Sequence, residues 1–431
     1  MQEPKRKISA GTVIMLALTA VVLIGTVFVL GRLSSGKPVD LSQLKPGALN
    51  LQEQKGNAGG NTAAPKPEQE EPSPAPAAAQ AAEETEVPES SAKTFTLAVA
   101  GTVSLDSEVR KNSYFSDVKQ YDYYDTMTLL KKELQADLNI AFLENLLTDE
   151  GKITDVTAPA AAAAMLKAAG FNAVACGFSK SYDKEEDGIR TTRKLLTEQG
   201  IIPLGIYDSE REEHFRILEF NGIRIALLQY TDTIASGTRK AMVKKETSGM
   251  VPAADAEAIA ADIAQARGQG AEAVLVLLNW GKTGKAPDKA MRTLAQEIAD
   301  AGADLIVGNG SRIVSGAETL TAQDTGRQVL CVWSLGTILS GDRSNIKRIA
   351  GMMLQATVRT EEGHTVILDF RYVPLYTWKY KQDGRMNYRC LAANGSVPDG
   401  MDADQQKMMA KAADTIRDAM KDTPAEERTG E

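Results

Sequence analysis

From Thr94 onward the sequence alternates short apolar runs of β-type residues with longer helical segments, and this alternation limits the possible folds more than any other feature. The runs FTLAVAG, DLNIAFLE and NAVAC predict strands, and an alanine-rich helix ending at Gly170 separates the second run from the third. Further helices are predicted at 187–198, 253–267 and 289–301, with apolar strands between them. This order indicates an α/β fold with a mixed sheet or two packed sheets, in which loops at the carboxyl ends of strands carry the site.

Two antiparallel pairs complete the predicted folded region. RILEF-NG-IRIALLQY is typical of a β-hairpin, because Asn221-Gly222 favours the type I′ turn. IAGMMLQATVRT and HTVILDFRYVPLY predict a closing antiparallel pair, and a helix is expected from Asp402 to Lys421. We place the α/β domain at residues 94–378, followed by a C-terminal extension at 379–431 whose last residues are expected to be disordered.

The amino-terminal part of the chain predicts a membrane anchor and a spacer. A basic cluster, KRK, precedes an uncharged apolar run that predicts a transmembrane helix at 10–31. The cluster places residues 1–9 in the cytoplasm and the rest of this single-pass chain outside the cell membrane. A cleaved signal peptide is the alternative, but the run is long for one and no clear A-x-A site follows it. Residues 32–93 are rich in Pro, Ala and Glu and predict a disordered spacer.

Composition argues against several classes of function. The formal net charge of −8 argues against general nucleic-acid binding. The three cysteines show neither a disulfide framework nor the spacing of a zinc site, and Cys176 and Cys331 are expected to be buried thiols. The sequence has two histidines, His214 and His364, and both lie in stretches typical of sheet edges.

Six partial motifs, in order along the chain, carry a resemblance to a known family. They are Gly101-Thr102-Val103-Ser104-Leu105-Asp106, Phe142-Leu143-Glu144, Ala169-Gly170-Phe171-Asn172 with Gly177-Phe178-Ser179-Lys180, Asn279-Trp280-Gly281, Gly302-Ala303-Asp304-Leu305 with Gly308-Asn309-Gly310-Ser311-Arg312-Ile313, and Ser334-Leu335-Gly336-Thr337-Ile338. From about Phe95 to Tyr376 the sequence therefore resembles the CapA-type capsule-biosynthesis and poly-γ-glutamate-synthesis family. The resemblance implies a calcineurin-like metallophosphatase sandwich of two mixed sheets flanked by helices.

The resemblance also implies a two-metal site, but the motif positions lack the expected ligands. Thr102 stands where the family has its first aspartate, and Lys180, Asn279, Gly310 and Arg312 stand where it has histidines. Threonine, asparagine and glycine are poor ligands, and the two cations would repel a divalent ion. We therefore expect no catalytic residues, no bound metal and no other cofactor.

The same positions define a candidate binding cleft. We expect Thr102, Glu144, Lys180, Asn279 and Arg312 to converge on one cleft, because each follows a strand in the motif pattern. Lys180 and Arg312 are either solvated loop cations or, together with Lys282, the lining of a former metal cleft that would suit carboxylates or phosphates.

Three further residues complete the candidate cleft. Asp183, like Glu144, would pair with the cations and neutralise the pocket. Trp280 is either core packing, the default, or a platform for substrate. Ser334 has no histidine partner that the motifs supply, so a serine hydrolase has little support.

Three functions remain open at this point. The first is a membrane-anchored, surface-exposed and non-catalytic CapA-like protein in the assembly or export of an anionic extracellular polymer such as capsule or poly-γ-glutamate. The second is an active hydrolase or transferase of the same fold with a reduced or relocated site, for example one using Glu144 and Asp183 as an acid/base pair. The third is an architectural envelope scaffold. The expected partners are the membrane, through the N-terminal helix, and either an anionic polymer or other polymer-assembly membrane proteins.

Overall fold

The computed structural model describes residues 93–149, 153–361 and 364–430, which belong to one compact unit. The helix predicted at 10–31 and all of the spacer at 32–93 except Lys93 lie outside these residues. Within the described ranges, no helix combines the length and the apolar character needed to span a membrane. The membrane anchor thus stays a prediction.

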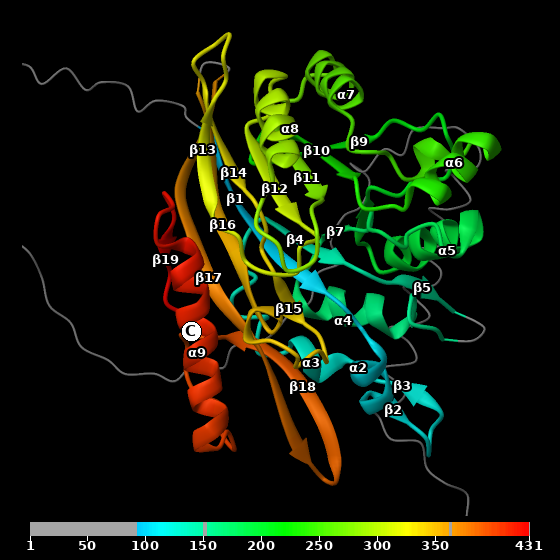
Figure 1. Cartoon of the computed structure of the whole chain (residues 1–431), viewed down its shortest axis with the longest axis vertical. Helices are drawn as coiled ribbons and strands as arrows, with labels where there is room; N and C mark the ends of the chain where they lie inside the picture. The colour runs from blue at the N-terminus through cyan, green and yellow to red at the C-terminus, as the bar shows by residue number, and fades with distance from the viewer. Residues whose placement is uncertain (1–92, 150–152, 362–363, 431) are drawn as a thin grey trace, which may run out of the picture. The chain divides into compact units, whose positions relative to one another are not determined.

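Two β-sheets packed face to face form the body of the described region (Figure 1). The first has nine strands in the main order β18-β17-β16-β1-β4-β7-β8, with β15 paired to β1 and β19 paired to β17. Strands β1, β4, β7 and β8 run parallel, whereas β1, β16, β17 and β18 pair in antiparallel fashion. The bounds are β1 Lys93–Val103, β4 Leu138–Leu143, β7 Ala173–Ala175, β8 Ile202–Leu204, β15 Thr337–Leu339, β16 Ala350–Glu361, β17 His364–Gln382, β18 Arg385–Ala392 and β19 Glu426–Glu427.

The second sheet has six strands in the order β13-β14-β12-β11-β10-β9. Its inner strands run parallel, and β9 and β13 add antiparallel edges. The hairpin predicted between β9 and β10 is confirmed, since Asn221 and Gly222 have φ of 51° and 75°. The bounds are β9 Phe215–Phe220, β10 Ile223–Thr231, β11 Ala273–Asn279, β12 Leu305–Asn309, β13 Ala317–Thr321 and β14 Gln328–Val332.

Alternation along the strands divides the core into layers. Leu97 and Val99 of β1 face the space between the sheets, together with Leu275 and Leu277 of β11. Side chains of opposite orientation, such as Ala98, face the helices that cover the other side of the nine-stranded sheet. The prediction of two packed mixed sheets is therefore confirmed.

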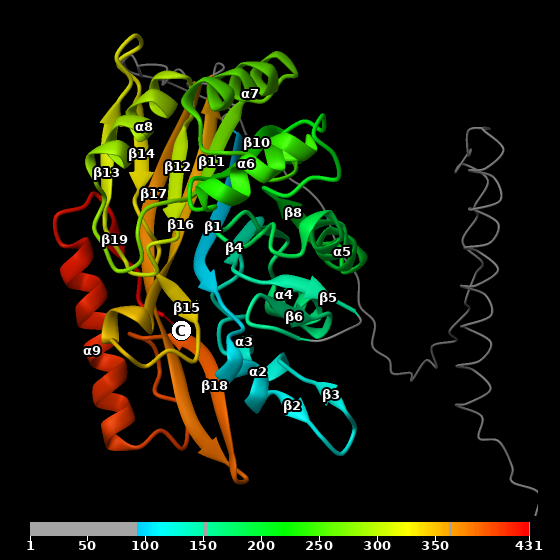
Figure 2. The same cartoon turned by 45° about the vertical axis from the view of Figure 1, so that its right-hand side comes forward.

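Helices cover both outer faces of the sandwich (Figure 2). α4 and α5 pack on the nine-stranded sheet, and α7 and α8 pack on the six-stranded sheet. As predicted, α4 ends at Gly170, whose φ of 115° is the left-handed conformation that terminates a helix. The helices are α2 Ser107–Asn112, α3 Tyr124–Met127, α4 Ala161–Ala169, α5 Glu185–Glu198, α6 Ser236–Lys245, α7 Ala256–Gly268, α8 Lys289–Asp300 and α9 Ala403–Met420, with 3₁₀ turns η2 Ser248–Met250 and η3 Ile346–Arg348. Two small sheets pair β2 Tyr114–Phe115 with β3 Gln120–Tyr121, and β5 Leu146–Thr148 with β6 Thr157–Pro159.

The C-terminal residues are part of the sandwich. The boundary placed between residues 378 and 379 falls inside β17, and β18 pairs with this part of β17 to form the sheet edge. α9 buries Met409, Ile416 and Met420 against the same core as the facing sheets. The last residues were expected to be disordered, but β19 pairs with β17. All three cysteines are buried and free, as predicted for Cys176 and Cys331.

Candidate functional site

The carboxyl ends of strands from both sheets meet at one cavity. Glu144 follows β4, Asp232 follows β10, Asn279 ends β11, and Arg312 lies in the loop after β12. These four residues line a cavity of about 760 Å³, and Lys282 and Asp288 of the loop after β11 join them. The strand register explains the convergence, because Thr231 pairs with Asn279 and Asn279 pairs with Asn309 at the same level of the six-stranded sheet.

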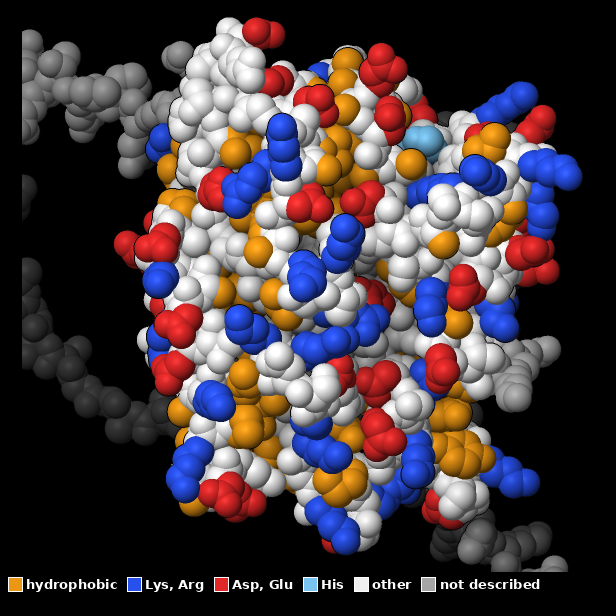
Figure 3. Space-filling view, viewed as in Figure 1, with side chains coloured by type: hydrophobic (Ala, Val, Ile, Leu, Met, Phe, Trp, Pro, Cys, Tyr) orange, Lys and Arg blue, Asp and Glu red, His pale blue; other side chains and the backbone are white. Residues whose placement is uncertain are grey.

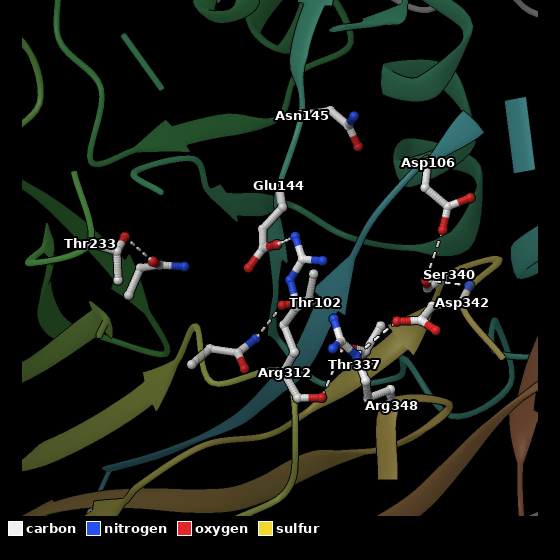
Figure 4. Close-up of polar contacts among 12 residues, drawn as sticks. Thr102, Asp106, Glu144, Asn145, Thr233, Arg312, Thr337, Ser340, Asp342 and Arg348 are labelled. Atoms are coloured by element: carbon white, nitrogen blue, oxygen red, sulfur yellow. Dashed lines mark hydrogen bonds and ion pairs between the residues drawn. The ribbon is translucent and has the colours of Figure 1, made fainter. Parts of the chain in front are cut away.

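An ion pair occupies the centre of the predicted cleft. The Arg312 guanidinium donates a hydrogen bond to Oε2 of Glu144, a residue 168 positions away (Figure 4). The side chain of Glu144 is only 6% exposed, whereas that of Arg312 is 36% exposed. Arg312 has φ of 62°, a left-handed conformation that a non-glycine residue rarely adopts. Its loop is held by a hydrogen bond of 3.3 Å from the Thr337 hydroxyl to the Arg312 carbonyl.

Thr102, at the position where the resemblance implies an aspartate, is neutral and hydrogen-bonded. Thr102 is completely buried, and its Oγ1 accepts a hydrogen bond of 2.8 Å from Nδ2 of Asn309. Ser334 in turn donates to Oδ1 of Asn309 at 3.2 Å. Since β1 and β12 belong to different sheets, this chain of contacts ties the two sheets together. Thr102 and Ser334 thus hold Asn309 and do not line the cavity.

The motif after β12 has no room for a side chain at Gly310. Gly310 has φ of 108°, and a Cβ there would lie 2.7 Å from the Trp280 carbonyl oxygen and 2.9 Å from its backbone nitrogen. The same Cβ would lie 3.2 Å from Oδ1 of Asn279, which accepts a hydrogen bond of 2.7 Å from the Thr233 hydroxyl. The Trp280 backbone and the Asn279 side chain therefore leave no room at Gly310 for the histidine that the resemblance implies at this position.

These residues do not fit a two-metal centre. In the part of the chain that the structure describes, no group of three or more His, Cys, Asp or Glu side chains is arranged to hold a metal ion. The Arg312 guanidinium is paired with the carboxylate of Glu144, the acidic residue of the Phe142-Leu143-Glu144 motif. Bringing a divalent cation to Glu144 would require displacing Arg312 and would place two cations side by side.

The motif aspartate Asp106 survives in a structural role. Its Oδ1 accepts hydrogen bonds of 3.1 Å from the backbone of Glu108 and Val109, which caps α2. Its Oδ2 accepts hydrogen bonds from the Ser340 hydroxyl at 2.8 Å and the Gly341 amide at 2.6 Å (Figure 4). Asp106 thereby fixes the segment after β15 to the start of α2.

Asp342, in the segment after β15, has a pKa that nearby arginines lower. Asp342 forms an ion pair of 2.8 Å with Arg348 (Figure 4). Burial opposes ionisation of Asp342, but hydrogen bonds from Ser344 and the charges of Arg348 and Arg312 outweigh it and lower its pKa. Arg312 therefore affects two acidic groups: it contacts Glu144 directly, and its charge lowers the pKa of Asp342.

Besides Thr102 and Ser334, three more of the predicted residues lie away from the cavity lining. Lys180 and Asp183 are exposed on the loop after β7, although the neighbouring Ser179 reaches the cavity. Trp280 is fully buried, stacks on Trp333 at 5.7 Å between ring centroids, and donates a hydrogen bond of 2.9 Å to the Trp333 carbonyl. Trp280 is thus a core residue in this structure. Of the candidate residues, Glu144, Asn279 and Arg312 share the cavity.

Sequence reasoning missed four carboxylates of the cavity, those of Asp232, Asp255, Asp288 and Glu297. Asp232 directly follows a predicted strand, so the rule that strand ends carry the site could have identified it. Asp288 caps α8 from a loop eight residues beyond Trp280, and no motif pointed to it. Desolvation raises the pKa of Asp232 to about 6; a hydrogen bond from the Gly281 amide opposes this rise, and the charge of Asp288 adds to it.

Comparison with known proteins gives a consistent set of relatives. The family model described as "Bacterial capsule synthesis protein PGA_cap" matches residues 96–342. The PGA biosynthesis protein CapA of Bacillus subtilis (strain 168) is 29% identical over 157 residues, which cover 36% of this chain and 40% of that protein. The capsule biosynthesis protein CapA of Bacillus anthracis is 26% identical over 215 residues, which cover 49% of each chain. The matched region spans less than half the length of either curated relative.

Solved structures show a distant likeness. The calcineurin-like phosphoesterase YfkN from Bacillus subtilis matches 76% of this chain and 99% of its own, with a TM-score of 0.36 and 10% identity. A novel phosphatase from Mycoplasma pneumoniae matches 65% of this chain and 93% of its own, with a TM-score of 0.35 and 12% identity.

Proposed function

This chain belongs to the bacterial capsule synthesis protein family PGA_cap, and we propose that it is a non-catalytic, membrane-anchored participant in the assembly or export of an anionic extracellular polymer. Its two curated relatives carry names that refer to PGA and capsule biosynthesis. A polymer such as capsule or poly-γ-glutamate is therefore the substrate context that these relatives support. The apolar run at 10–31 supports an anchor that holds the sandwich outside the cell membrane.

The Glu144–Arg312 ion pair is the main observation that supports a non-catalytic role. A hydrolase of the two-metal type needs an open set of anionic or imidazole ligands that hold cations and activate a water molecule. Here the buried carboxylate is neutralised by an arginine, and the Trp280 backbone leaves no room for a side chain at Gly310. The same scaffold then serves to bind or to position a partner.

An enzyme that uses Glu144 and Asp183 as an acid/base pair has less support. Glu144 is ion-paired, and Asp183 lies on the exposed side of its loop and does not line the cavity. An acid/base pair has to reach the same substrate within hydrogen-bond distance.

The test of catalysis uses the full-length chain purified in detergent. Phosphodiester and γ-glutamyl substrates are supplied with Mn²⁺ or Zn²⁺, and the metal content of the protein is measured in parallel. We expect neither stoichiometric metal nor metal-dependent turnover. Turnover that requires added metal and disappears in Glu144→Gln would overturn the non-catalytic proposal.

The polymer role and the topology are tested in cells. Deleting the gene in its host should reduce surface polymer, and the wild-type gene should restore it; unchanged polymer in the deletion strain would contradict this role. Protease added to intact, wall-stripped cells should degrade the sandwich, whereas protection would contradict the outward orientation.

A further inference from the structure

The cavity carries an excess of negative charge. Its acidic lining residues are Glu144, Asp232, Asp255, Asp288 and Glu297, and its cations are Lys282 and Arg312. Glu144 and Arg312 offset each other, because they form an ion pair. Lys282 is then the remaining cation among the described lining residues, facing four carboxylates. In Figure 3, basic and acidic side chains are mixed around a hollow in the middle of the face.

Two of these carboxylates form the strongest candidate for a cation site. Asp232 accepts a hydrogen bond from the Gly281 amide, and the charge of Asp288 acts on it. Asp288 itself accepts a hydrogen bond of 3.1 Å from the Met291 amide. No lysine, arginine or histidine of the described chain forms an ion pair with either carboxylate, so their mutual repulsion is left uncompensated. An ammonium group between them would be attracted by both charges.

Asn279 supplies an independent sign of a ligand. The residue is 2% exposed and lines the cavity. Its Oδ1 accepts a hydrogen bond of 2.7 Å from Thr233, but its Nδ2 group donates to no acceptor in the described residues. A carboxylate or carbonyl oxygen in the cavity would accept from this amide.

We propose that the cavity binds the zwitterionic end of an amino acid or of a γ-glutamyl chain. Asp232 and Asp288 hold its ammonium group, and Lys282 and Nδ2 of Asn279 hold a carboxylate. Asn279 is the last residue of β11, while Lys282 and Asp288 lie in the loop that follows it, and all three line the same cavity. The volume of about 760 Å³ lies in the range typical of small-ligand sites. The choice of γ-glutamyl chemistry rests on the proposed function, whereas the zwitterion requirement rests on the cavity alone.

Calorimetric titration of the full-length chain in detergent tests this inference. The probes are glutamate, a γ-glutamyl trimer with a free amino end, N-acetylglutamate and glutarate. We expect the probes with a free ammonium group to bind at least tenfold more tightly than N-acetylglutamate and glutarate. Tighter binding of the trimer would identify the polymer end, and tighter binding of glutamate would identify the free amino acid. Equal binding of the acetylated probe, or no binding of any probe, overturns the inference without affecting the polymer phenotype of the deletion strain.

Matched variants locate the binding residues. Asp232→Asn and Lys282→Ala should each weaken binding at least tenfold. Lys285→Ala, in the same loop but outside the cavity lining, and Asp399→Asn, an exposed residue remote in sequence, should bind as the wild type does. Thermal unfolding verifies that each variant is folded, and the comparison of probes on the wild type decides the question if one variant is not. Unchanged affinity in folded Asp232→Asn would contradict the assignment.

Discussion

Removing the Arg312 side chain should destabilise the sandwich by leaving a buried carboxylate without its cation. Breaking a fully buried ion pair costs about 3–5 kcal/mol, because the remaining charge stays desolvated. The Glu144 side chain is 6% exposed, but that of Arg312 is 36% exposed, so water can partly replace the guanidinium. We therefore expect Arg312→Ala to lower the free energy of unfolding by about 2–3 kcal/mol. Alanine keeps a side chain at φ of 62°, so the backbone cost is the same in both proteins.

A double-mutant cycle separates the ion pair from other effects of the substitution. The single variant Glu144→Gln should lower the free energy of unfolding less, by about 1 kcal/mol, because the remaining arginine is open to solvent. If the uncompensated charge causes the loss, adding Glu144→Gln to Arg312→Ala should restore at least about 1 kcal/mol.

The assay is equilibrium urea unfolding of the full-length chain, followed by the fluorescence of its three buried tryptophans. Lys407→Ala serves as the control, because Lys407 and Asp404 form a pair that is 79% and 93% exposed. Its loss should change the stability by less than about 0.5 kcal/mol. An Arg312→Ala protein as stable as this control, or strictly additive single and double variants, would refute the reasoning.

Three further outcomes follow from the same region. Gly310→His should destabilise the fold by at least about 2 kcal/mol in urea unfolding and should not raise the metal content, because its Cβ would lie 2.7 Å from the Trp280 carbonyl; a stable, metal-binding variant would contradict this. Thr102→Val should cost about 1–3 kcal/mol by leaving Nδ2 of the fully buried Asn309 unpaired, while Thr102→Ser should cost less; equal losses would contradict the hydrogen-bond explanation. The folded-state pKa of Asp232 is raised to about 6, so this carboxyl weakens the fold as pH rises from about 4 to 6, and the melting temperature of Asp232→Asn relative to wild type should increase over that interval; a difference that is flat with pH would contradict it.

The sequence alone was sufficient for the elements with strong local signals and for the residue types at the motif positions. Apolar periodicity and turn residues are local properties, so the β9–β10 hairpin and the end of α4 at Gly170 could be read directly. Residue types at motif positions, such as Arg312, were enough to argue against a two-metal centre. Local sequence signals could not predict where the domain ends, because β18 and α9 belong to it through tertiary contacts with β17 and β16.

The tertiary structure decided which charges meet. Lys180 and Arg312 looked equivalent as loop cations, but the left-handed backbone at Arg312 turns its guanidinium onto Glu144, while Lys180 stays exposed. Contacts between residues 168 positions apart depend on how two sheets and their loops pack, and no periodicity in the sequence encodes that packing. For the same reason, only the fold revealed that Asp232 and Asp288, together with Asp255 and Glu297, give the cavity its excess of negative charge.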